Sequence, residues 1–457
     1  MKNPIDFKDF PPISDKAWKQ QIQADLKGGD YNELLTWTSP EGIVVKPFYT
    51  EADIPEAGEG KSEPGAGGWK IGYAFNLGSE KARDLVGTNL ENGVEALLVR
   101  VPYEELEKLG EIKSVPVPQF WDLPGSDQKL LNGLKKVAHP KAECLLDPIH
   151  TLVTSGNWVV NKEMDLEVLG SFASANELNT CLAIHMDRYQ NAGATRVQEL
   201  AYALAHGHEY LLRSVDDQRL KPLLEAPVFL VSMGNEYFFE IAKLRALRKL
   251  WELLAQEYGY SGKCKIIARP SLRNKTLYDY NTNMLRTTTE CMSAILGGAD
   301  VICNLPYDTL YHYPNDFASR ISRNQLLLLK HESYFDSVSN PADGSYYIES
   351  LTDQLGQKAL EVFKSIEKGG GFLSQLREHT IQKKIEESAL KEQKAFDAGK
   401  RVLVGSNKYS NSDDHMAETL EKNPFRPFRK VQTQIAPILA KRLSEASERK
   451  RLEDEKI

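Results

Sequence analysis

From about residue 69 onward, short unbroken apolar runs alternate with longer stretches of helical period. Short apolar runs of this kind indicate buried strands, whereas apolar residues three or four positions apart indicate amphipathic helices. Eight runs predict strands, near residues 70–75, 95–101, 142–147, 180–184, 227–232, 264–268, 300–304 and 401–405. Strands that alternate with helices favour a parallel sheet, and eight such units favour a closed (β/α)₈ barrel, the TIM-barrel class of α/β fold.

The segments between these runs carry apolar stripes of helical spacing. Two of the clearest stripes consist of Ile241, Leu244, Leu247 and Trp251, and of Leu355, Ala359, Val362 and Ile366. Stripes of this width bury one face of a helix, so we expect these helices to cover the outside of the barrel.

The two ends of the chain lack the strand–helix rhythm. Ser14 is expected to cap a helix in which Trp18, Ile22 and Leu26 share one face. Residues 51–68 are acidic and rich in proline and glycine, which is typical of a linker. We therefore predict an N-terminal arm and linker for subunit contacts (1–68), a barrel (69–410) and a charged, helical C-terminal tail (411–457).

Composition excludes several classes of protein. The net charge is -7 and basic residues are dispersed among acidic ones, which argues against a nucleic-acid partner. The five cysteines form no CxxC pair, which indicates reduced, buried thiols. The N-terminus does not resemble a signal peptide and no apolar run is long enough to span a bilayer. We expect a cytoplasmic protein without a membrane partner.

Motifs of common catalytic and binding sites are weak or absent. PEAGEGKS (55–62) departs from a phosphate loop because Pro55 takes the place of its first glycine. His185 and Asp187 follow the fourth predicted strand, at the rim where barrel active sites lie. A zinc site needs further ligands that the spacing does not identify, so no metal-binding residues are predicted.

Several long segments together resemble one enzyme family. RTTTECMSAILGGADVICNLPYD (286–308), DFASRISRNQLLLLKHES (316–333) and NPADGSYYIESLTDQL (340–355) resemble signatures of the cobalamin-dependent methylmalonyl-CoA mutase family. The resemblance runs in consistent order over residues 5–410. It implies a (β/α)₈ barrel and an adenosylcobalamin-dependent rearrangement between methylmalonyl-CoA and succinyl-CoA, a reaction of propionate metabolism. In catalytic chains of this family, the barrel threads coenzyme A through its centre.

The family's cobalamin motif is not matched. Catalytic chains carry a flavodoxin-like domain whose Asp-x-His-x-x-Gly motif supplies a histidine to cobalt. Here only the stretch around His415 approaches that motif, and it ends in Glu418 instead of glycine. Too few residues follow His415 for such a domain, so the resemblance implies no cofactor bound by this chain and adenosylcobalamin in a partner subunit.

The family's catalytic residues do not carry over either. Catalytic chains have GYHMQEAGA where this chain has MDRYQNAGA (186–194), so Asp187 replaces a tyrosine and Arg188 replaces the histidine that contacts the substrate thioester. An arginine is always charged and has a different donor geometry. At the first strand, Trp69 of GAGGWKIGYAFN (65–76) is kept, but the substrate-contacting tyrosine and arginine are not. Asp187, Arg188 and Trp69 thus mark a degenerate site without catalytic residues.

Other features resemble the small (beta, non-catalytic) subunit of this family. ARPSLRNKTLYDYNTNMLRT (268–287) contains the short SxRxxTxYD form in place of the longer RTH(S/C)QTSG element of catalytic chains. Bulky residues fill the runs 94–101, 226–233, 265–268 and 401–405 at either parity. A barrel that threads coenzyme A needs small polar residues inside, so a filled barrel is expected here.

Three functions remain open. The leading hypothesis is a small subunit that supports a larger, homologous, catalytic chain in a heterodimer. The second is the substrate-binding catalytic chain of a split isobutyryl-CoA-mutase-type enzyme, with cobalamin on a separate chain. Such a chain would keep the tyrosine–arginine motif and the histidine at position 188, and this chain keeps neither. The third is a free-standing CoA-binding or regulatory protein. The acyl-CoA of the complex is not specified by any of these residues.

Overall fold

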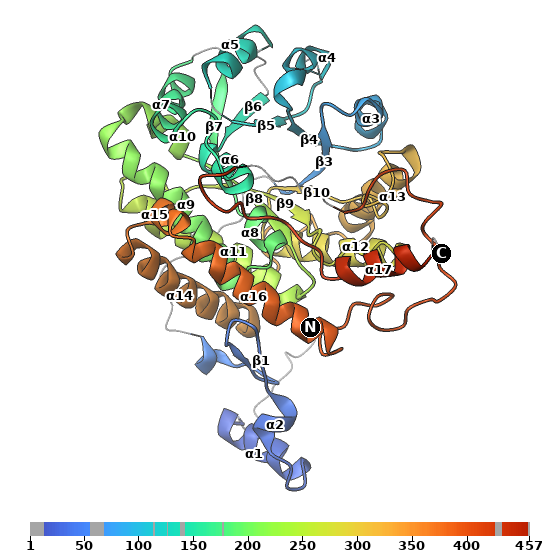
Figure 1. Ribbon diagram of the computed structural model, residues 1–457. Helices are drawn as coiled ribbons and strands as arrows, with labels where there is room; N and C mark the ends of the chain where they lie inside the picture. The colour runs from blue at the N-terminus through green and yellow to red at the C-terminus, as the bar shows by residue number, and fades with distance from the viewer. Residues whose placement is uncertain are drawn as a thin grey trace, which may run out of the picture.

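A computed structural model describes residues 13–54, 68–112, 115–125, 127–137, 142–175, 178–425 and 432–455. Its central feature is a closed barrel of parallel strands in the order β10-β3-β4-β5-β6-β7-β8-β9 (Figure 1). The strands are β3 (Lys70–Asn76), β4 (Ala96–Arg100), β5 (Gln119–Asp122), β6 (Ala142–Leu146), β7 (Asn179–His185), β8 (Val228–Met233), β9 (Lys265–Pro270) and β10 (Val301–Cys303). The predicted (β/α)₈ fold is confirmed.

One strand assignment was wrong and one strand was missed. Residues 401–405 form no barrel strand; Val404 makes only an isolated bridge with Lys408 after a long helix. The missing strand is β5, whose four residues QFWD include only two apolar side chains. The search for apolar runs therefore failed to predict a short strand with polar ends, and it predicted a strand where the chain forms a loop. As a result, the strand predicted as the fourth, β7, is the fifth of the barrel.

Helices surround the barrel, and short helices also lie in the loops at its ends (Figure 1). The predicted stripe at Ile241–Trp251 is buried on α11, and α14 packs across α9 and α11 as a further layer. The helices of the barrel region are α3 (Glu80–Glu91), α4 (Leu109–Ile112), α5 (Gln128–Val137), α6 (Pro148–Ser155), α7 (Lys162–Ala173), α8 (Asp187–Ala192), α9 (Arg196–Asp216), α10 (Lys221–Leu224), α11 (Tyr237–Gln256), α12 (Thr282–Leu296), α13 (Asp316–Leu327), α14 (Tyr346–Lys368), α15 (Phe372–Arg377) and α16 (Thr380–Asp397). None of the described helices is long and apolar enough to cross a membrane.

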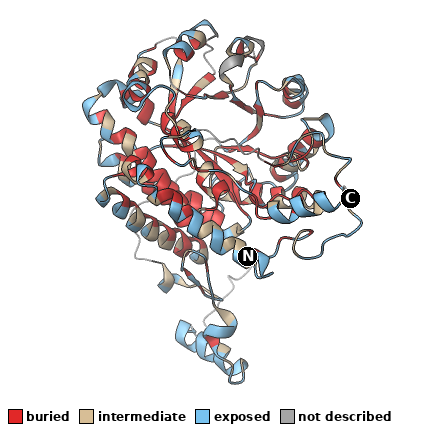
Figure 2. Cartoon of the chain, viewed as in Figure 1, coloured by how far each residue is buried: buried red, intermediate tan, exposed pale blue. Residues whose placement is uncertain are grey.

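The buried core divides into two main layers (Figure 2). The larger layer lies between strands and helices, and the smaller one fills the inside of the barrel. The inner layer consists of Ala96, Leu98, Phe120, Leu145, Cys181, Ala183, Val228, Leu230, Ile267, Val301 and Cys303. Because these side chains pack against one another, the barrel axis is closed, as the strand composition predicts.

The N-terminal arm extends away from the barrel (Figure 1). It contains α1 (Asp15–Asp25), α2 (Tyr31–Leu35) and an antiparallel pair of β1 (Trp37–Thr38) and β2 (Val44–Val45). The predicted cap is confirmed, since the Ser14 side chain accepts a hydrogen bond from the Ala17 amide. Among the described residues, the arm packs on the barrel through its base, where Trp37 contacts Phe239 of α11 and where Ile43 and Val45 join the main core. Most of the linker, including the stretch that approaches a phosphate loop, lies outside the described residues.

In the described part of the C-terminal tail, the helical segment is α17 (Glu445–Asp454) and the other residues are irregular. Residues 432–444, called the strap here, are extended and run across α6 and α8 (Figure 1). Backbone amides of the strap donate to carbonyl oxygens of the helices and loops that follow the barrel strands: Ile435 to Gly156, Ile438 to Val153, Lys441 to Asn191 and Leu443 to Arg273. Residues 435–444, predicted as part of a helical tail, are therefore irregular, because Pro437 disfavours a helix and the neighbouring amides bond to the barrel.

Candidate functional site at the mouth of the barrel

The inside of the barrel changes from apolar to charged at the carboxyl ends of its strands. Successive side chains alternate across a strand, so Asp122 lies on the same face as Phe120, and His185 on the same face as Ala183. By the same alternation, Arg100 of β4 and Arg269 of β9 also lie on the inner face of the barrel. A polar layer thus sits above the apolar interior, at the end where barrel enzymes place their active sites.

Asp147 is the centre of a buried polar network in this layer. It follows β6 and caps α6, where its Oδ1 accepts the His150 amide at 2.9 Å. The same oxygen accepts from His206 Nε2 and from the Tyr210 hydroxyl, both at 2.8 Å. Burial alone raises the pKa of Asp147, but the charge of His206 and the hydrogen bonds from His185 and His206 outweigh it and hold the pKa well below its ordinary value.

His185 lies between two carboxylates. Its Nδ1 is 2.8 Å from Asp147 Oδ2 and its Nε2 is 3.1 Å from Asp122 Oδ1. Burial lowers the pKa of His185, but Asp122 and then Asp147 raise it to about 10. In return, the charge of His185 overcomes burial and lowers the pKa of Asp122. The imidazole therefore carries a positive charge at neutral pH and links the two acids.

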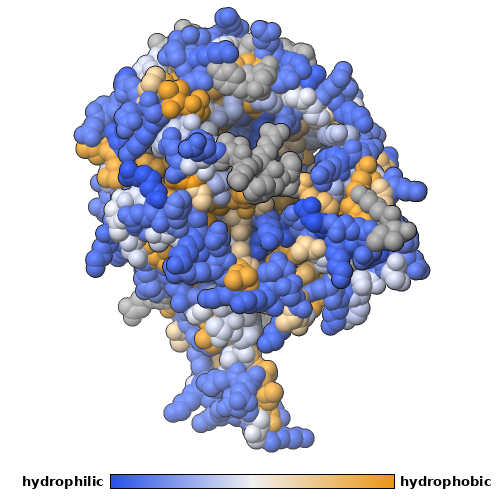
Figure 3. Space-filling model, viewed as in Figure 1, coloured by the Kyte–Doolittle hydropathy of each residue, from blue (hydrophilic) through white to orange (hydrophobic). Residues whose placement is uncertain are grey.

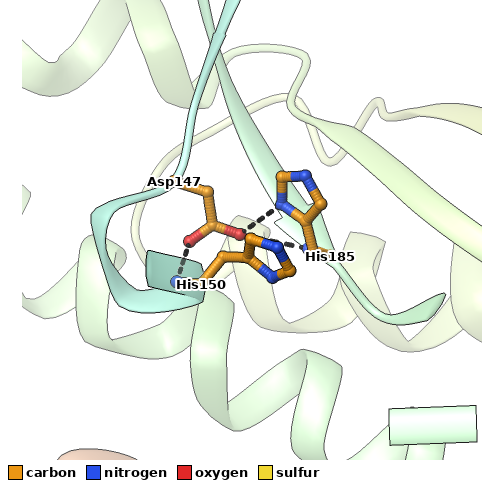
Figure 4. Close-up of side chains that lie close together, drawn as sticks. All are labelled: Asp147, His150 and His185. Carbon is orange, nitrogen blue, oxygen red and sulfur yellow. Dashed lines mark hydrogen bonds and ion pairs between the residues drawn. The ribbon is translucent and has the colours of Figure 1, made fainter. Parts of the chain in front are cut away.

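His150 stacks on His185, with ring centroids 3.8 Å apart and 19° between the planes (Figure 4). Burial and the charge of His185 hold the pKa of His150 well below its ordinary value, so its ring is neutral. Within the described parts of the chain, the ring nitrogens of His150 have no hydrogen-bond partner. Donor atoms of Asp147, His150 and His185 all lie within 4.8 Å of one another.

A cavity of about 700 Å³ opens beside this network. Asp122 lines its wall together with Arg100 and Arg269, and the loops after β3 and β10 complete it. Arg100 lies 3.5 Å from Asp122, whereas the buried Nε of Arg269 has no hydrogen-bond partner among the described residues. The arrangement offers charged groups of both signs to a small polar molecule.

Two of the three residues marked from the sequence lie at this mouth. Asp187 and Arg188 begin α8 directly after His185, and the charge of Arg188 contributes to the low pKa of His150. Trp69 is elsewhere, since it precedes β3 and lies at the opposite end of the barrel. Its buried indole donates to the Phe335 carbonyl at 3.3 Å and stacks under the Lys330 ammonium, which indicates a packing role.

The sequence placed His185 at the rim of the barrel, without predicting a role for it, and did not point to its partners. Asp122 was missed together with β5. Asp147 and His150 had a usable signal, because Asp-Pro directly after a predicted strand is typical of a helix N-terminus at the strand's carboxyl end. His206 lies within the apolar pattern of α9, so nothing in the pattern points to the site.

Comparison with known proteins gives one consistent family. A family model described as methylmalonyl-CoA mutase matches residues 145–454. The methylmalonyl-CoA mutase small subunit of Porphyromonas gingivalis is 33% identical over 448 residues, covering 89% of this chain and 71% of that protein. The small subunit of Propionibacterium freudenreichii subsp. shermanii is 28% identical and covers 91% of this chain and 71% of that protein. A methylmalonyl-CoA mutase of Rhizobium meliloti is 27% identical and covers 89% of this chain and 65% of that protein.

Proposed function

Because the chain belongs to the methylmalonyl-CoA mutase family, in its small-subunit branch, we propose that it supports a larger, catalytic, homologous chain in a heterodimeric adenosylcobalamin-dependent mutase. In this proposal the complex interconverts methylmalonyl-CoA and succinyl-CoA in the cytoplasm. The barrel of this chain stabilises the larger subunit and does not carry out the rearrangement.

The observation that supports this role best is the closed barrel axis. A catalytic barrel of this family threads coenzyme A through its centre, which requires space along the axis. Here Leu98, Phe120, Leu145 and Leu230 fill that space as part of one packed cluster. Opening it would leave a cavity that costs several kcal/mol, so the packed state opposes entry of the pantetheine chain.

The residues at the mouth agree with a supporting role. Arg188 takes the position at which catalytic chains have a thioester-contacting histidine, and it is held at the start of α8. Trp69, the residue kept from the family's first-strand motif, packs at the far end of the barrel. The tyrosine–arginine pair and the histidine needed by a catalytic chain of the split type are thus not found at their expected places.

The described residues do not fit a cobalamin site. The side chain of His415, in the nearest match to the cobalt-binding motif, is 73% exposed and lies 4.0 Å from Glu455 in an irregular segment. The described ranges contain only two sheets, the barrel and the small β1–β2 pair, so no flavodoxin-like sheet positions this histidine. We therefore place adenosylcobalamin on the partner subunit in this proposal.

Purification of the tagged chain from its own cells, followed by intact-mass analysis of what accompanies it, tests this function. We expect a near-stoichiometric, larger homologous chain with a cobalamin domain. A small chain that binds only cobalamin would favour the split catalytic enzyme. Absence of any homologous partner would contradict the supporting role and favour a free-standing CoA-binding or regulatory protein.

A further inference from the structure

The three side chains in Figure 4 come from different elements and lie close together. Asp147 ends β6, His150 lies in the first turn of α6, and His185 ends β7. Each offers one donor atom, and all three atoms lie within 4.8 Å of one another. Asp147 and His185 are fully buried, so ligand groups of this kind are held without competition from bulk water.

The distances suit a shared metal ion. Nδ1 of His185 and Oδ2 of Asp147 are 2.8 Å apart. Two atoms that bind one ion at about 2.0–2.2 Å lie about 3 Å apart in an octahedral shell and about 3.4 Å apart in a tetrahedral one, so a small widening of this pair admits an ion. Without an ion, a proton on His185 bridges these atoms, and an ion would take the place of that proton.

The groups behind the ligands resemble those that support protein metal sites. A metal-bound histidine almost always donates its other ring N–H to a carboxylate or carbonyl, which orients the ring. Asp122 accepts from Nε2 of His185 in that manner, at 3.1 Å. The second oxygen of Asp147 is likewise fixed by His206 and Tyr210, which leaves Oδ2 directed towards His185.

His150 offers the third ligand, and it is less buried than Asp147 and His185. Within the described residues neither of its ring nitrogens makes a hydrogen bond, so both can accept a further ligand. Its ring stacks on that of His185 with 19° between the planes, so the imidazole has to turn out of the stack for its in-plane lone pair to reach an ion held by Asp147 and His185.

We propose that Asp147, His150 and His185 form a binding site for a borderline divalent cation such as Zn²⁺, Co²⁺ or Fe²⁺. Two imidazoles and one carboxylate are a ligand set that such ions take, with remaining positions open to water. The charges of Asp122 and Asp147 balance a divalent ion, whereas the nearby Arg100 and Arg188 oppose it. The site is independent of the supporting function proposed above.

Titration of the chelator-treated full chain with Co²⁺ alone, followed by visible absorption, tests the site. We expect one Co²⁺ per chain with ligand-field bands, and displacement by Zn²⁺, which binds such ligands more tightly. His150→Phe keeps a ring stacked on His185 but removes a ligand, so we expect affinity to fall by at least about tenfold. His415→Ala is the control, because that histidine is highly exposed and should leave binding unchanged.

Three results would overturn the proposal: no Co²⁺ uptake by the unaltered chain, equal affinity in His150→Phe, or loss of binding in His415→Ala, which would indicate a surface histidine only. Circular dichroism checks that each variant is folded. If His150→Phe does not fold, Asp122→Asn serves instead, since it removes the carboxylate behind His185 and should also weaken Co²⁺ binding by about tenfold or more.

Discussion

At the residue scale, the sequence predicts the chemistry of a side chain only where that chemistry follows from the residue type and not from its neighbours in space. The exchange of histidine for arginine at position 188 is what the family resemblance implies from the sequence alone, and this prediction does not depend on the fold. The network around Asp147 depends on the fold, because Asp122, His185 and His206 come together from β5, β7 and α9. Contacts between residues this far apart in the chain follow from the closure of the barrel and have no local signal.

Arg188→Ala tests whether the degenerate site takes part in the reaction of the complex. A supporting subunit contributes no transition-state contact here, so the purified complex should retain its turnover within about tenfold, roughly 1.4 kcal/mol in barrier. The measurement is a steady-state mutase assay of the complex made with each form of this chain. A larger loss of kcat, with assembly unchanged, would contradict a non-catalytic role for this residue.

The cysteines give a second prediction for individual residues. All five thiols are free and buried, as the sequence indicates. Burial raises the pKa of Cys264 to about 11 and that of Cys144, Cys181 and Cys303 to about 12. The thiolate is the reactive form, so a thiol reagent at pH 8 should label none of them in the folded chain and all five after unfolding in urea.

The same shifts give the sign of a pH effect on stability. In the unfolded chain these thiols lose their protons near pH 8.5, whereas in the folded chain they keep them up to about pH 11 to 12. The buried thiols therefore make their full contribution to the free energy of unfolding below about pH 8.5, and this contribution falls as the pH rises towards 11. Urea midpoints measured between pH 8 and 10.5 should decline, and changing Cys264 to serine should reduce the decline; an unchanged slope would contradict this origin.

At the element scale, the regular barrel units were predictable and the irregular segments were not. Helical stripes such as that of α11 follow from spacing alone. The short strand β5 has too few apolar residues to give a pattern, and residues 401–405 show the pattern of a strand outside the sheet. The strap was predicted as part of a helical tail, but Pro437 interrupts the helical pattern and the strap amides bond to the barrel instead.

Two neighbouring residues of the strap test whether it stabilises the barrel. Ile438 is 4% exposed and packs in the main core, whereas Leu439 is 44% exposed. Ile438→Asp places a charge in an apolar contact and should cost about 2–5 kcal/mol of unfolding free energy. Leu439→Asp is the matched control and should stay within about 0.5 kcal/mol. Equal urea midpoints for the two variants would mean that the strap contributes little to stability.

At the scale of the whole molecule, the arm is the part that the barrel does not explain. No residue of α1 is buried, and the arm protrudes from the barrel with apolar side chains along one side (Figure 3). Trp18 is 49% exposed and Leu34 is 61% exposed. A segment of this kind loses conformational freedom without burying its apolar surface in return, so we expect a partner's surface to cover it.

Deletion of residues 1–40 should therefore weaken association with the larger subunit while leaving the barrel folded, because Ile43 and Val45, which pack in the main core, lie outside the deleted segment. The double variant Trp18→Ser and Leu34→Ser should raise the dissociation constant by at least about tenfold, since each removes apolar area worth about 1–2 kcal/mol when it is buried at an interface. Leu253→Ser is the control, as Leu253 is 61% exposed like Leu34 but lies on α11 of the barrel. Analytical ultracentrifugation of the reconstituted complex measures the effect. If assembly tolerates the arm variants as well as it tolerates Leu253→Ser, the contact between subunits must lie on the barrel itself, and the exposed side chains of the arm have another role.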